Sequence, residues 1–143
     1  MADTQVELIK KNAELVIGQL GPLSGIEFGL NRASVEWVEG FIERQRTRED
    51  FDPEAGSSLE SVLGSFLGEC IIANAGGEWQ SSDLYGWGIA FSADDWAFPF
   101  AKVEKAFRNG VEGGDSILSF YDTTVHFLAT GKLSGLHSGN ENF

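Results

Sequence analysis

The sequence predicts one α+β domain over residues 1–130, with about five helices packed around a small two- to three-stranded antiparallel sheet. The chain has 143 residues, of which 42% are hydrophobic, and a chain of this length can bury roughly 70% of its unfolded surface. Apolar residues recur at helical spacing in several segments, and residues 84–91 alternate between bulky and small side chains, as a strand does. The single cysteine, Cys70, excludes an internal disulfide. The sequence shows no repeat and no second domain.

Two amphipathic helices are expected in the first third of the chain. Residues 4–20 carry apolar side chains at steps of three and four positions, which predicts a helix, and Gly21-Pro22 is expected to end it. A second helix is expected from residue 32 or 34 to Arg48. Its first turns carry glutamates and its last turns carry arginines, an order that complements the helix dipole.

A third helix is expected over residues 58–74, with a wide apolar stripe on one side. The opposite side is small rather than charged, because Gly64 and Gly68 lie on it. Each glycine weakens a helix by about 1 kcal/mol relative to alanine, so the pair is best explained by another segment that packs closely there. We therefore expect a central helix that is covered on both sides.

The strands of the small sheet are expected next along the chain. Residues 78–80 and 84–91 flank a polar turn at residues 81–83, and residues 96–98 can add a short third strand. Residues 84–91 place bulky side chains on one face of the strand and small ones on the other. Small residues in a strand often mark a close approach, so we expect the small face to pack against the glycine side of the third helix.

Two more helices are expected after the sheet. Pro99 suits the first turn of a fourth helix, which Asn109-Gly110 ends. A fifth helix is expected to follow a cap at residues 115–116, although its β-branched residues leave a strand open for residues 117–121. Residues 131–143 are rich in glycine, serine and asparagine and are expected to form a flexible C-terminal tail.

Three stretches of the chain resemble segments of uncharacterised bacterial domains. They are SVEWVEGFIER (residues 34–44), GSFLGECIIANAGG (residues 64–77) followed by Glu78-Trp79, and Pro99-Phe100-x-Lys102-Val103-x-Lys105 with Asn109-Gly110. Together they cover roughly residues 34–110. The resemblance implies a small bacterial α+β domain of unknown function, and it implies no activity.

The composition excludes several classes of protein. With 22 acidic and 10 basic residues, the chain has a formal charge of −12 at pH 7, which disfavours direct nucleic-acid binding because such binding needs a basic surface. No apolar stretch approaches the roughly 20 residues of a membrane span, and the first residues do not resemble a secretion signal. With a lone thiol, these features predict a cytoplasmic protein.

Negative charge is concentrated in residues 49–101, which contain ten acidic residues and no lysine or arginine. Such asymmetry can steer a basic partner protein by long-range attraction, although it can also serve solubility alone. The residues expected to bind such a partner are Glu49, Asp50, Asp52, Glu54, Asp83, Asp94 and Asp95.

The sequence gives no motif for a metal or a cofactor, and neither is expected. His126, His137 and Cys70 have no ligand spacing, and Pro53 breaks the calcium-loop pattern in the acidic stretch around it. Cys70 with His126 has the residue types of a nucleophilic pair. However, Cys70 lies in the apolar stripe of its helix, which favours the role of a small buried hydrophobe.

Glu69 is the most interesting single acid, because it lies on the side of the third helix that we expect to be covered. A covered carboxylate needs hydrogen-bond donors or has a raised pKa. This reasoning gives a possible ligand pocket formed by Glu69, Trp79, Tyr85 and Trp87.

The leading functional hypothesis is a non-enzymatic protein-binding module that recognises a basic partner, for example a toxin-neutralising protein. The alternative is a small hydrolase or ligand-binding protein with a pocket around Glu69. A third hypothesis is a homo-oligomer whose glycine-rich and aromatic faces form the contact.

Overall fold

The structure is a computed structural model that describes residues 4–52 and 57–130. Within these residues the chain forms five helices and a three-stranded antiparallel sheet of order β1-β2-β3, which confirms the α+β class. No helix among them combines the length and hydropathy that a membrane span needs. The elements are α1 (Thr4–Ser24), α2 (Arg32–Arg46), α3 (Ser57–Ala75), β1 (Glu78–Ser82), β2 (Gly86–Ala90), β3 (Trp96–Ala97), α4 (Pro99–Asn109) and α5 (Ile117–Thr130).

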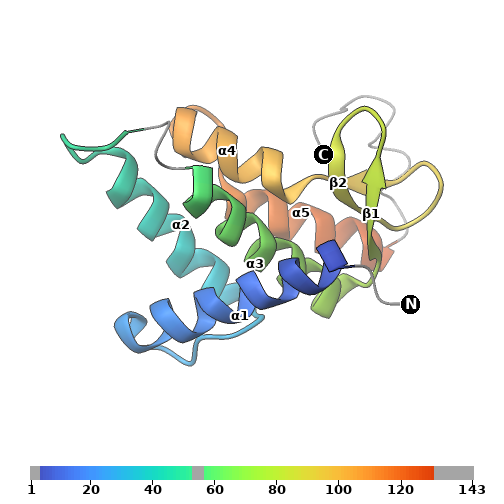
Figure 1. Cartoon of the computed structure of the whole chain (residues 1–143), viewed down its shortest axis with the longest axis horizontal. Helices are drawn as coiled ribbons and strands as arrows, with labels where there is room; N and C mark the ends of the chain where they lie inside the picture. Colours follow the sequence, from blue (N-terminus) through green and yellow to red (C-terminus); the bar gives the residue numbers. More distant parts are fainter. Residues whose placement is uncertain (1–3, 53–56, 131–143) are drawn as a thin grey trace.

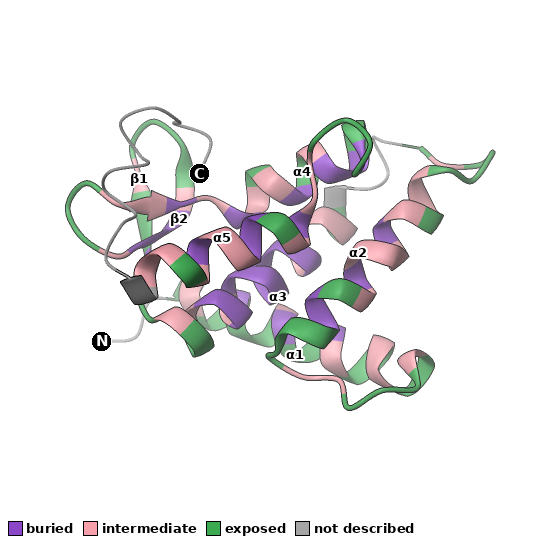
Figure 2. Ribbon diagram, turned by 180° about the vertical axis from the view of Figure 1, so that it is seen from behind, coloured by how far each residue is buried: buried purple, intermediate pink, exposed green. Residues whose placement is uncertain are grey.

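Helix α3 lies at the centre of the molecule (Figure 1), with α1 on one side of it and α5 on the other. Figure 2 shows that the buried residues gather on α3 and on the faces that the other helices turn toward it. Gly64 lies against Phe100, and Gly68 lies against Trp79 and Pro99. Both sides of α3 are therefore covered, as the two glycines predict.

We expected the small face of the second strand to pack against the glycine side of α3, and this expectation was wrong. Trp79, Ile89 and Ala97 are cross-strand partners and are all buried, so the bulky face of the sheet turns toward the core. On the small face of β2, Phe98 covers Gly88, since its ring would lie 2.7 Å from a Cβ there, whereas no other described residue lies within 4 Å of a Cβ on Gly86. The large apolar face is buried because it removes more apolar surface from water than a face of glycines can.

Helix α1 runs through Pro22 and ends at Ser24, so the expectation that Gly21-Pro22 would end it was wrong. A proline in the last turn removes one backbone N–H with little helix left to disrupt. The Ser24 hydroxyl donates to the Gly21 carbonyl at 2.7 Å, and Gly25 follows with a φ of 73°, a value that glycine adopts readily.

Helix α2 ends at Arg46, two residues earlier than expected. Its first turn is capped by Asn31, whose side-chain oxygen accepts from the Ser34 N–H at 2.9 Å. At the other end the Thr47 hydroxyl donates to the carbonyl of Glu43 at 3.0 Å. These side-chain bonds replace helical bonds at both ends and so fix where α2 begins and ends.

The hairpin turn lies two residues later than expected. Strand β1 continues to Ser82, whose hydroxyl accepts from the backbone N–H groups of Leu84 and Tyr85 at 3.2 Å each. Strand β2 begins at Gly86, which has a φ of 77°. Tyr85 therefore lies in the turn and not on the strand, because the serine hydroxyl stabilises the turn at this point.

The last two helices agree with their sequence signals. Helix α4 begins at Pro99 and ends before Gly110, which has a φ of 71°. Ser116 caps α5 by accepting from the Ser119 N–H at 3.0 Å, so residues 117–121 are helical and the strand alternative is wrong. The expectation of a flexible tail concerns residues 131–143, which lie outside the described part of the chain.

Candidate functional site

The acidic residues predicted to bind a partner are divided between the two ends of the long axis (Figure 1). Helix α3 has 19 residues and so separates the loop before it from the hairpin after it by about 28 Å. The Debye length is about 8 Å at physiological ionic strength, so the two groups act independently and do not form one surface. Glu54 lies outside the described residues. Glu49, Asp50 and Asp52 follow α2 at one end, and Asp83, Asp94 and Asp95 lie beside β2 at the other.

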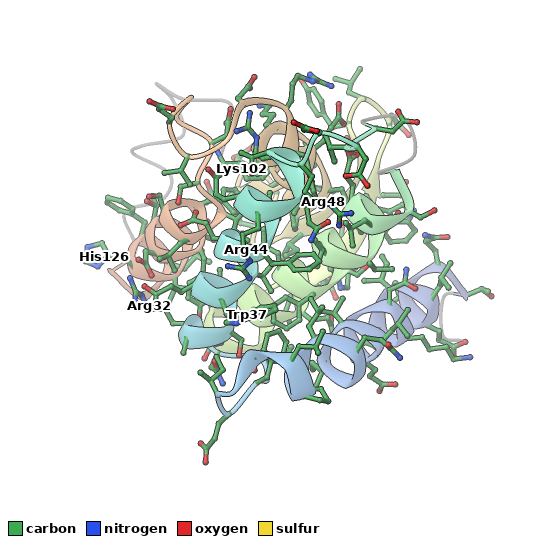
Figure 3. The ribbon with its side chains drawn as sticks, turned by 90° about the vertical axis from the view of Figure 1, so that its left-hand side faces the viewer. Arg32, Trp37, Arg44, Arg48, Lys102 and His126 are labelled. Atoms are coloured by element: carbon green, nitrogen blue, oxygen red, sulfur yellow. The ribbon has the colours of Figure 1, made fainter. Side chains whose placement is uncertain are left out.

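Some of these carboxylates are already engaged in the fold. Asp50 accepts two hydrogen bonds from Arg48, at 3.0 and 2.9 Å, and these bonds lower the pKa of Asp50. Figure 3 looks onto this end of the molecule and labels Arg48. Asp95 accepts from the Ser92 hydroxyl at 3.0 Å within its own loop. Glu49, in contrast, is exposed and makes no ion pair with a described residue.

A cleft of about 390 Å³ lies beside the first of these acidic loops, between the ends of α2 and α4 and the first turn of α3. We call it the carboxylate cleft. One wall is aromatic, because the ring of Phe51 stacks on Phe107 with centroids 5.8 Å apart and an interplanar angle of 6°. The residues that line the carboxylate cleft are Arg46, Phe51, Glu60, Glu104, Phe107 and Arg108.

Both guanidinium groups in the carboxylate cleft are bound within the fold. Arg46 donates to the backbone carbonyls of Phe107 and Arg108 at 3.0 and 3.1 Å, and Arg108 forms an ion pair with Glu104, as their i,i+4 spacing predicts. Glu60 accepts no hydrogen bond from a described residue. Burial, and then the charge of Glu104, raise the pKa of Glu60, while Arg108 acts in the opposite direction. The cleft therefore favours a cation, or a proton, beside Glu60.

Glu60→Gln should raise the melting temperature at pH 7 and should not raise it at pH 3. The folded state holds the pKa of Glu60 above its unfolded value of about 4.3, so stability is lost as the pH rises from that value through the folded pKa. Glutamine cannot ionise, so the variant does not lose this stability at pH 7. At pH 3 Glu60 is protonated in both the folded and the unfolded state, so the substitution should bring no such gain. Thermal unfolding followed by circular dichroism measures the effect, with Glu14→Gln on the exposed face of α1 as the control. Equal gains at both pH values would contradict the electrostatic explanation.

The predicted pocket around Glu69 is divided in the structure. Glu69 accepts from the indole N–H of Trp79 at 2.9 Å and lies 3.5 Å from the ammonium group of Lys10, with 12% of its side chain exposed. Trp79 is one of the three aromatic residues that the sequence grouped with Glu69, and the contact with Lys10 was not predicted. This arrangement joins α1, α3 and β1, which is a structural role.

Tyr85 and Trp87 lie elsewhere, in a groove of about 290 Å³ between α1, α3, the hairpin and the start of α4. We call it the aromatic groove. Phe98 and Phe100 also line it, as does Leu8 of α1. The many aromatic residues around Pro99 indicate in the sequence that an aromatic cluster forms there. Nothing in the local sequence predicts that α1 lies beside this cluster.

The described residues form no group of three histidine, cysteine, aspartate or glutamate side chains that could hold a metal ion. Cys70 is fully buried, and burial followed by the nearby charge of Glu69 raises the pKa of its thiol. The thiolate that a nucleophile needs is therefore disfavoured at neutral pH. His126 is exposed on α5 and packs edge-on against Phe127 (Figure 3). Cys70 is the small buried hydrophobe that the sequence favoured.

A scan against protein-family models, a search of curated proteins and a search of solved structures find no match to this chain. The resemblance of residues 34–110 to bacterial domains stays a prediction.

Proposed function

We propose that this chain is a non-enzymatic binding module that recognises a basic partner protein through the carboxylate cleft. One observation carries the proposal: Glu60 faces a cleft of about 390 Å³ with a raised pKa and with no donor among the described residues. A carboxylate whose ionised form lacks a donor weakens the fold at neutral pH. Such carboxylates are common in functional sites. A protein that neutralises a basic toxin is one member of this class.

The shape of the carboxylate cleft suits a lysine or arginine side chain. The cationic head would lie beside Glu60 and Glu104, where a charge-assisted hydrogen bond can form. The aliphatic stem would lie along Phe51 and Phe107, because long basic side chains bury their methylene groups against apolar surfaces. Both guanidinium groups of the cleft are held by other partners in the fold, which leaves the Glu60 carboxylate as the acceptor for an incoming cation.

The negative charges of the loop that follows α2 would also attract a basic partner protein. Glu49 and Asp52 are exposed beside Phe51, which forms part of the cleft wall. Charges at the rim of an interface chiefly raise the association rate and its dependence on salt, whereas charges at its centre set the dissociation rate. We therefore assign Glu60 to anchoring and Glu49 to steering. The acidic residues at the hairpin end lie too far away to contribute.

The test uses two matched probes, N-acetyl-arginine amide and its neutral near-isostere N-acetyl-citrulline amide, titrated into ¹⁵N-labelled protein. The arginine probe should shift the amide resonances around Phe51, Glu60 and Phe107, and the citrulline probe should not. Glu60→Gln should weaken binding by roughly ten- to a hundredfold, since a hydrogen bond to a charged group contributes roughly 1.5–3 kcal/mol. Glu14→Gln should bind as the wild type does. Equal binding of the two probes, or shifts confined to another surface, would refute the proposal.

A partner captured from lysate supplies the second stage of the same test. Capture should weaken as salt rises, because exposed charges are screened over about 8 Å at physiological ionic strength. It should be lost with Glu60→Gln and retained with Glu14→Gln. A protein that both variants retain equally does not bind through the carboxylate cleft, and such a result would count against the proposal.

A further inference from the structure

The aromatic groove has features that binding of a basic protein does not explain. It lies between α1, α3, the hairpin and the first turn of α4, away from the carboxylate cleft, and its volume is about 290 Å³. Binding sites for small molecules have volumes of roughly 300–1,000 Å³, so the groove matches a compound of one or two rings. The walls of the groove come from segments that are far apart in the sequence. The packing of these segments in the core holds the walls in position.

The rings of the groove are held in place by their neighbours. Tyr85 meets Phe98 edge-on, with centroids 5.4 Å apart and an interplanar angle of 60°. Phe98 in turn stacks on Trp96 at 5.9 Å, and Phe100 packs against Trp79 at 5.5 Å. A flat ligand would therefore meet a largely preformed surface, which lowers the entropy lost on binding.

Two of the exposed side chains at the groove are large and apolar for the most part. Tyr85 in the hairpin turn is 71% exposed, and Leu8 of α1 is 48% exposed, and both line the groove. Their exposure to water is unfavourable by about 25 cal/mol per Å² of apolar surface. A ligand that covers both would recover part of that free energy.

The polar groups of the groove indicate what kind of ligand it would take. None of the described residues that line it carries a formal charge, and a charged group buried without a partner is strongly disfavoured. Asn12 and the indole N–H of Trp87 make no hydrogen bond with a described residue. They are a donor–acceptor amide and a donor, and so they match a neutral ligand that carries its own hydrogen-bonding group.

From these features we infer that the aromatic groove is a binding site for a neutral, planar aromatic compound of one or two rings with a hydrogen-bonding group. Stacking on Tyr85 and Phe98 would provide most of the affinity, and Asn12 and Trp87 would set the orientation. The inference is independent of the proposed protein partner, because the carboxylate cleft and the aromatic groove share no described residue.

The test uses indole as the neutral aromatic probe, followed by NMR on the indole N–H resonance of Trp87. Cyclohexanol serves as a neutral probe without an aromatic ring, and tryptamine as a cationic aromatic probe. Indole should shift the Trp87 resonance in a saturable manner, and the other two probes should bind at least several-fold more weakly. Absence of a shift with indole, or equal binding of the three probes, would overturn the inference.

Two hairpin variants provide a matched control for that test. Tyr85→Ala should weaken indole binding by roughly two- to tenfold, because an aromatic pair contributes about 0.5–1.5 kcal/mol. Leu84→Ala alters the neighbouring turn residue, which is 81% exposed and does not line the groove, and it should leave binding unchanged. Both residues are exposed, so neither change threatens the fold. Equal affinity in the two variants would place the probe outside the aromatic groove.

Discussion

Gly68→Ala should destabilise the protein by about 1–3 kcal/mol, the usual effect of overfilling a packed core. Alanine is the better helix former by about 1 kcal/mol, so propensity alone predicts the opposite sign. An added Cβ would lie 2.1 Å from Cη2 and 2.3 Å from Cζ2 of Trp79. That ring cannot move away cheaply, because it is buried and its N–H is bound to Glu69 at 2.9 Å.

Gly18→Ala in α1 is the matched control for this prediction. It is also a helical glycine, but a Cβ there would have no heavy atom within 4 Å. We expect it to stabilise the protein by about 0.5–1 kcal/mol. Urea unfolding of both variants measures the difference. If Gly68→Ala were as stabilising as Gly18→Ala, the close packing of α3 against β1 would be wrong.

Lys102→Met should destabilise the protein by about 2–3 kcal/mol, somewhat less than the roughly 3–5 kcal/mol seen when a fully buried ion pair loses one partner. The ammonium group of Lys102 lies 2.9 Å from Asp115, and each side chain is only 15% exposed. Asp115 also accepts from the Asn109 amide at 2.8 Å. Without Lys102, the mostly buried carboxylate of Asp115 keeps the Asn109 amide as its side-chain donor among the described residues.

The stability lost in Lys102→Met should depend on pH. Burial acts to raise the pKa of Asp115, but the hydrogen bonds from Asn109 and Lys102 and the charges of Lys102 and Lys105 together outweigh it, so the pKa is lowered. The ionised carboxylate of Asp115 therefore stabilises the fold above its unfolded pKa of about 3.9. This stabilisation is lost as the pH falls through the folded pKa of Asp115. The stabilities of the wild type and of Lys102→Met should differ most at neutral pH, and the difference should shrink as the pH falls through the folded pKa of Asp115.

Arg48→Met removes an ion pair of similar geometry on the surface and serves as the control. The Arg48–Asp50 pair spans 2.9 Å, but its side chains are 57% and 72% exposed, and such pairs contribute less than about 1 kcal/mol. Urea unfolding at pH 7 and pH 3 compares the two variants. A large loss in Arg48→Met, or a difference for Lys102→Met that does not change with pH, would contradict the account of Lys102.

The sequence predicted the elements of the fold where a periodic pattern and its end signals agreed. Helix α4 is the best example, since Pro99 and Gly110 mark its two ends. The errors lie where contacts beyond the local pattern decided the outcome. The Ser24 hydroxyl stabilises the turn of α1 that follows Gly21, and the Ser82 hydroxyl draws Tyr85 into the hairpin turn.

The candidate sites were less predictable, because their residues meet through packing between distant segments. The Glu69–Trp79 bond could be anticipated, since a carboxylate on a covered helix face needs a donor. Glu60 and Glu104 each have a local explanation, as a residue of the first helical turn and as half of an i,i+4 pair. Only the packing of α3 against α4 brings them into one cleft.

The central position of α3 also bears on how the chain assembles during its synthesis. Helix α1 packs chiefly on α3, which is complete only at residue 75. A ribosome that adds about 5–20 residues per second needs roughly 3–10 s to proceed from the end of α1 to that point. Throughout that interval the apolar stripe of α1 lacks its native docking surface, so α1 can join the folded body only after α3 has been synthesised.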